Sequence, residues 1–180
     1  MPVDVTDHPS ARQASMGPIL AAVAAAIAAI LELTVATRIH VGDAQPQFVL
    51  VVAVLLTLII GFEEGMVWAF VGGLFIDLLA FRPLGTTVFS LLAVVGLAEA
   101  ISPMLARVRF ARPLVGIAIF TPVFITLITV TTGLLRPPAP SMRFSYMFAA
   151  VLANVLAAAV IAPLFGILRR QWEMRARQRW

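Results

Sequence analysis

Three carboxylates lie inside long apolar stretches of the sequence, where a charged group is costly and therefore informative. Asp77 is the clearest case, because no other charged residue occurs between Glu64 and Arg82. A carboxylate at the centre of a membrane helix costs about 2.5–3.5 kcal/mol on insertion scales, so such residues face the interior of a helix bundle and have partners. We expect Asp77 to be a structural cap for the turn at residues 82–85. A proton or ion site and a direct contact with a partner protein are the alternatives.

Glu32 and Glu99 are the other two carboxylates, and we expect structural roles for both. Glu32 lies six residues before Arg38, towards the end of its apolar stretch. Glu99 lies near Arg107, whose long side chain can run along the membrane boundary and reach it. A pairing of Glu32 with Asp77 stays open, because spacing alone does not test it.

The rest of the sequence holds little that catalysis requires. The chain has no cysteine, and its two histidines, His8 and His40, lie outside the apolar stretches. No residues have the spacing of a zinc site, and Gly72-Gly73 lacks the lysine and the preceding strand of a phosphate-binding loop. We therefore predict a protein that is not an enzyme and that uses no cofactor or metal.

The composition is that of a membrane protein. Of the 180 residues 61% are hydrophobic and 12% are charged, and the mean hydropathy is +1.00. Soluble domains have about 25% charged residues, and disordered chains have low hydrophobicity, so both classes are excluded. The net charge of +4 comes with 13 arginines and no lysine. Because these arginines lie in loops and tails, we expect them to set the orientation in the membrane and to bind anionic lipid rather than nucleic acid.

Long, continuous apolar segments predict an all-α integral membrane protein with about six transmembrane helices in one domain. Residues 1–16 are expected to form a flexible cytoplasmic tail, residues 17–168 the membrane domain, and residues 169–180 a basic cytoplasmic tail. The second segment is short for a span. The apolar segments are 17–37, 47–61, 65–81, 84–104, 113–135 and 144–168.

The distribution of arginine predicts the orientation. If six segments cross and the N-terminus is cytoplasmic, nine arginines lie on the inner side and four on the outer side. Cytoplasmic loops carry an excess of Lys and Arg, so both termini are predicted to be cytoplasmic. Five of the nine lie in the C-terminal tail, which we expect to bind anionic lipid at the membrane surface.

Small residues form a stripe along the third segment. Gly65, Ala69 and Gly73 recur at intervals of four residues, and Asp77 ends the series. Residues four apart lie on the same helix face, and small residues there allow another backbone to approach closely. We expect the third helix to be central in the bundle and its stripe to form, or to support, a groove for a partner's transmembrane helix.

A short motif extends this stripe. Gly73 is followed after three residues by Asp77, and Leu84-Gly85 comes after a short turn. In this pattern the stretch 61–85 resembles the family of the rod shape-determining protein MreD. Ala69 stands where that family often has another glycine, and Pro46 precedes the second segment as is common there. The similarity covers residues 46–85.

The resemblance implies a non-enzymatic scaffold in the bacterial inner membrane, within the elongation (rod) complex. Family members are expected to work with an MreC-like single-pass membrane protein and with a RodA-like glycosyltransferase and its penicillin-binding transpeptidase. The link to the MreB filament is indirect. Together these proteins build lateral peptidoglycan and maintain rod shape.

Two other functions stay open at this point. The family is thought to share the fold of the substrate-binding subunits of energy-coupling-factor vitamin transporters, so a vitamin-binding subunit is the first alternative. Few polar groups in the apolar segments are available to form such a site. An intramembrane enzyme or proton-coupled carrier that uses Asp77, and Glu32 with it, is the second alternative.

Overall fold

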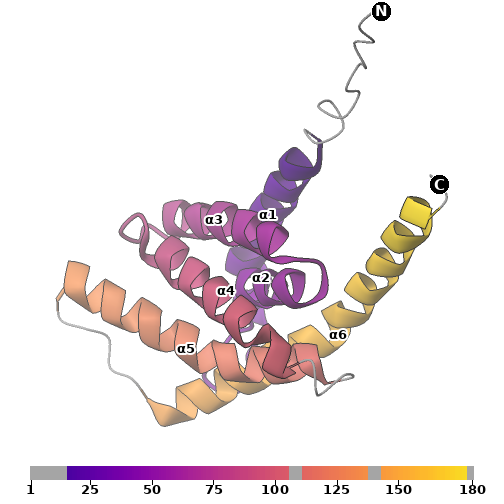
Figure 1. Cartoon of the computed structure of the whole chain (residues 1–180). Helices are drawn as coiled ribbons and strands as arrows, with labels where there is room; N and C mark the ends of the chain where they lie inside the picture. Colours follow the sequence, from indigo (N-terminus) through magenta and orange to yellow (C-terminus); the bar gives the residue numbers. More distant parts are fainter. Residues whose placement is uncertain (1–15, 106–110, 138–142, 178–180) are drawn as a thin grey trace, which may run out of the picture.

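The computed structural model describes the backbone of residues 16–105, 111–137 and 143–177. In these residues the chain forms six α-helices and one 3-10 helix, which confirms the predicted all-α class (Figure 1). The helices are α1 (Met16–Thr34), η1 (Ala36–Arg38), α2 (Phe48–Ile59), α3 (Phe62–Leu79), α4 (Thr86–Leu105), α5 (Arg112–Leu135) and α6 (Phe144–Arg177).

Three helices are long and apolar enough to cross a membrane, within the part of the chain that is described. They are α4, α5 and the portion Phe144–Gly166 of α6. The apolar portions Ala22–Thr34 of α1 and Phe48–Ile59 of α2 are shorter. Many large apolar side chains are exposed on the outside of the bundle, among them Phe89, Val130 and Phe148. An apolar exterior of this kind is suited to contact with lipid.

Helix α2 forms the centre of the bundle. Its sequence, FVLVVAVLLTLI, is apolar on every face, and all residues from Val49 to Leu58 are buried. A helix that is hydrophobic all round avoids water on every side, either inside a protein core or within a membrane. In this fold other helices surround α2, which packs against α1, α3, α4, α5 and α6.

The expectation that the third segment is the central helix is therefore wrong. Helix α3 packs against α1, α2 and α4 through its small residues, but Val67, Phe70 and Leu78 on its other side are exposed. The central place falls to α2, which has bulky apolar residues on every face.

The link between α2 and α3 is tighter than the sequence predicted. Helix α3 begins at Phe62 rather than near Gly65, so only Ile60 and Gly61 separate the two helices. The Gly61 N–H donates to the Leu56 carbonyl at 2.9 Å, which closes the end of α2. Glu63 and Glu64 lie in the first turn of α3, where negative charge is favourable to the helix dipole.

Helix α6 is the longest element and extends beyond the bundle towards the C-terminus (Figure 1). The segment predicted as a separate tail from residue 169 continues as helix through Arg177. Pro163 lies within it. The predicted N-terminal tail lies outside the described residues, apart from Met16, which begins α1.

Candidate functional site

Asp77 lies in the last turn of α3 and holds the start of α4. Its side chain is 1% exposed. Oδ2 accepts a hydrogen bond from the Gly85 N–H at 2.8 Å, and Oδ1 accepts one from the Thr87 N–H at 3.0 Å. Oδ1 also accepts from the Thr86 hydroxyl at 3.1 Å. The first N–H groups of a helix have no partner within the helix, so this carboxylate caps α4 from the preceding helix.

The turn that delivers these N–H groups depends on Gly85. Its φ is +96°, in the region that glycine adopts without strain. No described atom outside its immediate neighbours would lie within 4 Å of a Cβ at this position, so backbone conformation rather than space favours glycine here. Leu84, the other member of the Leu-Gly pair, is 66% exposed.

The glycines of the stripe lie against other helices of the same chain. A Cβ at Gly65 would lie 2.0 Å from Oγ1 of Thr57 in α2, and one at Gly73 would lie 2.8 Å from Cα of Val88 in α4. Ala69, between them, is fully buried. Gly72, beside the stripe, faces Val49 of α2 in the same way. The small residues thus let α2 and α4 pack closely on α3.

Glu32 caps the start of α2, as Asp77 caps the start of α4. Its Oε2 accepts a hydrogen bond from the Val49 N–H in the first turn of α2 at 2.8 Å. The two carboxylates therefore serve different helices, and each accepts backbone N–H groups rather than pairing with the other. The presence of Glu32 in an apolar stretch signalled such a contact, but Val49 as its partner was not predictable from spacing.

Asn154 of α6 holds the same end of α2. Its Oδ1 accepts from the Gln47 N–H at 2.7 Å, and its Nδ2 donates to Oε1 of Gln47 and to Oγ1 of Thr121, each at 3.2 Å. Residues of α1, α5 and α6 thus meet at the start of the central helix. Asn154 is fully buried, and these bonds use its polar atoms.

The expected pairing of Glu99 with Arg107 cannot be followed, because Arg107 lies outside the described residues. Glu99 itself is exposed on α4. Near it, the Arg112 guanidinium donates to the Ser102 hydroxyl, which ties the end of α4 to the start of α5.

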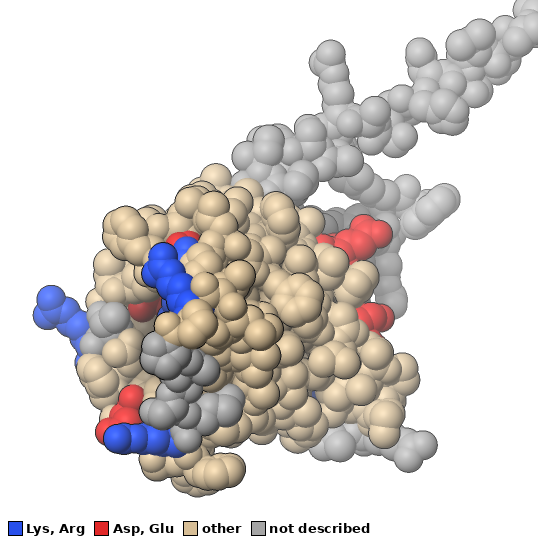
Figure 2. All heavy atoms as spheres, turned by 90° about the vertical axis from the view of Figure 1, so that its left-hand side faces the viewer, with Lys and Arg blue, Asp and Glu red and all other residues tan. Residues whose placement is uncertain are grey.

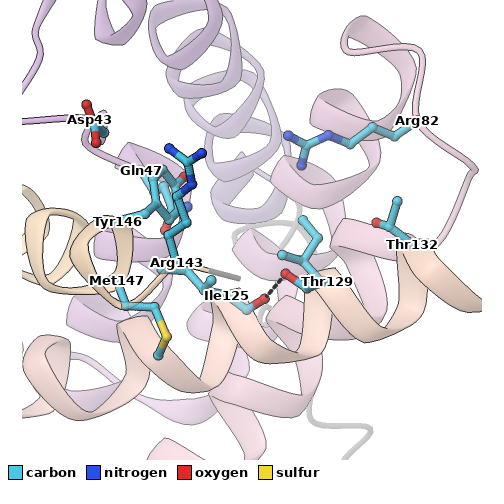
Figure 3. A pocket seen from close by; sticks show the side chains of 10 residues that line it. Asp43, Gln47, Arg82, Ile125, Thr129, Thr132, Arg143, Tyr146 and Met147 are labelled. Carbon is cyan, nitrogen blue, oxygen red and sulfur yellow. Dashed lines mark hydrogen bonds between the residues drawn. The ribbon is translucent and has the colours of Figure 1, made fainter. Parts of the chain in front are cut away.

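A polar pocket that the sequence did not suggest lies at the end of the bundle where α3 turns into α4. Its volume is about 560 Å³. Residues from the η1–α2 connection, the α3–α4 turn, the second half of α5 and the start of α6 line it (Figure 3). Neither Asp77 nor Glu32 is among the described residues of the lining, which are Asp43, Gln47, Arg82, Ile125, Ile128, Thr129, Thr132, Arg143, Tyr146 and Met147.

The rod shape-determining protein MreD family matches residues 13–172 of the chain. The chain belongs to this family. The match extends far beyond the motif region 46–85 and includes all six α-helices in whole or in large part. The chain is therefore a membrane protein with a role in determining rod cell shape, as the motif suggested.

Comparison with curated proteins and with solved structures gives no significant match. The expected likeness of the MreD family to the vitamin-binding subunits of transporters is thus not tested by a structural relative.

Proposed function

We propose that the chain is a non-enzymatic scaffold of the bacterial elongation complex, which supports lateral peptidoglycan synthesis. Membership of the MreD family supports this proposal, and one structural observation carries it further. Among the described residues, Asp77 and Glu32 are carboxylates with hydrogen bonds inside the bundle, and each caps backbone N–H groups at the start of another helix. They stabilise one arrangement of the helices, which is what a docking platform requires.

The partners follow from the family. We propose direct contact with an MreC-like single-pass membrane protein and with a RodA-like glycosyltransferase and its penicillin-binding transpeptidase, and indirect coupling to the MreB filament. The chain lies in the inner membrane with both termini cytoplasmic, as the arginine distribution suggests. Its basic C-terminal region binds anionic lipid at the cytoplasmic surface.

The stripe of Gly65, Ala69 and Gly73 supports the partner interface from inside the fold. Because these residues contact α2 and α4, a partner helix packs on an outward face of the α3–α4 pair instead. On α4, Ala93, Gly96 and Ala100 are at least partly exposed, and no described atom would lie within 4 Å of a Cβ at Gly96 apart from its own neighbours. Small residues on a lipid-facing surface favour close packing of another helix.

Co-purification tests this assignment. The tagged chain is extracted from its host in mild detergent, and the retained proteins are identified by mass spectrometry. A single-pass periplasmic coiled-coil protein together with a peptidoglycan polymerase is expected. Recovery of paired ATPases with a coupling membrane protein would instead identify a vitamin-transport subunit.

Two glycines provide matched variants for the interface. Gly96→Leu should reduce partner recovery while leaving the melting temperature of the purified chain nearly unchanged. Gly166→Leu, at an equally open position of α6, should leave recovery intact. Equal recovery with both variants would contradict a partner helix on the outward face of α4.

A further inference from the structure

The pocket described above combines features of a ligand site that the scaffold role does not use. Four segments far apart in the sequence converge on it: the connection at 43–47, the turn at Arg82, the second half of α5 and the start of α6. A volume of about 560 Å³ lies within the range of small-ligand pockets. The segments α5 and α6 enclose its apolar side.

Two arginines dominate the charge of this pocket. Arg82 reaches in from the α3–α4 turn and Arg143 from the residue just before α6, and their guanidinium groups face the same space (Figure 3). Neither guanidinium forms a hydrogen bond or an ion pair with the described residues. Guanidinium groups bind phosphate and carboxylate oxygens through two parallel hydrogen bonds. Two arginines in one pocket that have no partner among the described residues therefore favour an anionic group.

The opposing acidic residues do not neutralise this pair. Asp43 is the one carboxylate among the described lining residues, and in Figure 3 it lies beyond Arg143 rather than between the two arginines. Arg82 also attracts Glu32, whose carboxylate is held by the Val49 N–H. The space between the guanidinium groups remains available to a ligand that carries at least one negative charge.

Neutral groups complete the polar side of the pocket. The hydroxyls of Thr132 and Tyr146 have no hydrogen-bond partner among the described residues. They can donate to further oxygens of a tetrahedral anion, which has more acceptor positions than a carboxylate. A phosphate group therefore matches this set of donors better than a carboxylate.

The opposite wall of the pocket is apolar and suits a ligand with a hydrocarbon part. Ile125, Ile128 and Met147 line it. Ile125 is ten residues before the end of α5, about 15 Å along the helix axis, so the pocket runs from the polar end of the bundle into the apolar region. The neighbouring surface of α5 and α6 is also apolar, with Val130, Leu134, Phe144 and Phe148 exposed.

The surface at this end of the molecule carries few other charges. Figure 2 shows the side from which the α3–α4 turn projects, with arginine and acidic side chains scattered over an uncharged surface. An anionic headgroup in the pocket meets Arg82 and Arg143 together, while lipid tails lie against uncharged helix surface.

From this arrangement we propose that the pocket between Arg82 and Arg143 binds the phosphate group of an amphiphile, with its hydrocarbon part against α5 and α6. The proposal does not depend on which protein partners the scaffold has. A free phosphate ion shares the headgroup chemistry, so an experiment must compare the two sources directly.

Binding to the full chain in dodecyl maltoside micelles, which carry no phosphate group, tests the proposal. The probes are phosphatidic acid added to the micelles and inorganic phosphate or pyrophosphate added to the buffer. Native mass spectrometry and the melting temperature report binding. We expect retention of phosphatidic acid, and a rise in melting temperature, at concentrations where inorganic phosphate gives neither.

The variants are Arg82→Gln, Arg143→Gln and the control Arg136→Gln. Arg136 is an exposed arginine at the end of α5 that is not in the described lining. Each pocket variant should weaken retention by at least about tenfold, because a hydrogen bond to a charged group is lost. The control should not weaken it, and the melting temperatures without probe should agree for all three.

Three results are decisive. Selective loss of phosphatidic acid in the two pocket variants supports the amphiphile site. Equal, arginine-dependent binding of inorganic phosphate or pyrophosphate without a lipid preference would support the phosphate site but assign it to a soluble ligand. Equal loss in Arg136→Gln, or no binding of either probe to the unmodified chain, would overturn the proposal.

Discussion

The carboxylate of Asp77, at the end of α3, accepts the Gly85 N–H at 2.8 Å and thereby joins the two halves of the motif that identifies the family. The Thr87 N–H binds both oxygens of the same carboxylate, at 3.0 and 3.2 Å. The spacing between Asp77 and the Leu-Gly pair is thus the length of a turn that returns the start of α4 to the end of α3.

Replacement of Asp77 should destabilise the protein without preventing membrane insertion. Asp77→Leu leaves the N–H groups of Gly85 and Thr87 without acceptors, at about 1–3 kcal/mol for each buried group. Asp77→Asn should lose less stability than Asp77→Leu. One side-chain oxygen remains an acceptor, and the Gly85 N–H then faces an amide nitrogen, which cannot accept. Thermal unfolding in detergent measures both. Unchanged melting of Asp77→Leu would show that the cap contributes nothing.

Replacement by alanine should have opposite effects on stability at Gly73 and at Gly96. Gly73→Ala places a Cβ 2.8 Å from Cα of Val88, so α4 must move, and overpacking of this kind costs about 1–3 kcal/mol. Gly96→Ala meets open space and should be neutral or stabilising by up to about 1 kcal/mol, since alanine favours helix. The difference in melting temperature between the two variants is the measurement. A Gly73→Ala protein as stable as Gly96→Ala would contradict the packing described for α3 and α4.

Gly85→Ala isolates the effect of backbone conformation. The position has space for a methyl group but a φ of +96°. We expect a loss of about 1–3 kcal/mol from strain alone, again by thermal unfolding. Leu84→Ala is the control, because Leu84 is exposed and should tolerate the change. Similar stabilities of the two variants would show that the turn adopts a different conformation.

Variants of Glu32 distinguish a structural role of this carboxylate from a role in proton transfer. Glu32→Gln keeps an oxygen that can accept the Val49 N–H, so stability and partner recovery should change little. Glu32→Ala removes the acceptor and should cost about 1–3 kcal/mol. Melting temperature and co-purification of partners are compared for both variants. A Gln variant that folds normally but abolishes function in cells would favour the proton-carrier alternative.

The sequence alone determined the class, the helices and the family of this protein. Continuous apolar segments predicted an all-α membrane protein, and Gly73, Asp77 and Leu84-Gly85 indicated the family, because hydropathy and short motifs are local properties of the chain. Even the presence of a partner for Asp77 was predictable, since a carboxylate in an apolar helix requires one.

Only the tertiary structure decided how those helices are arranged. Lipid is as apolar as a protein core, so hydropathy does not distinguish a helix buried among five others, such as α2, from one that faces lipid. For the same reason the sequence did not show that Glu32 and Asn154 bind the start of α2, or that Arg82 and Arg143 line one pocket. These features bring together residues that are distant along the chain, and their positions depend on how whole helices pack.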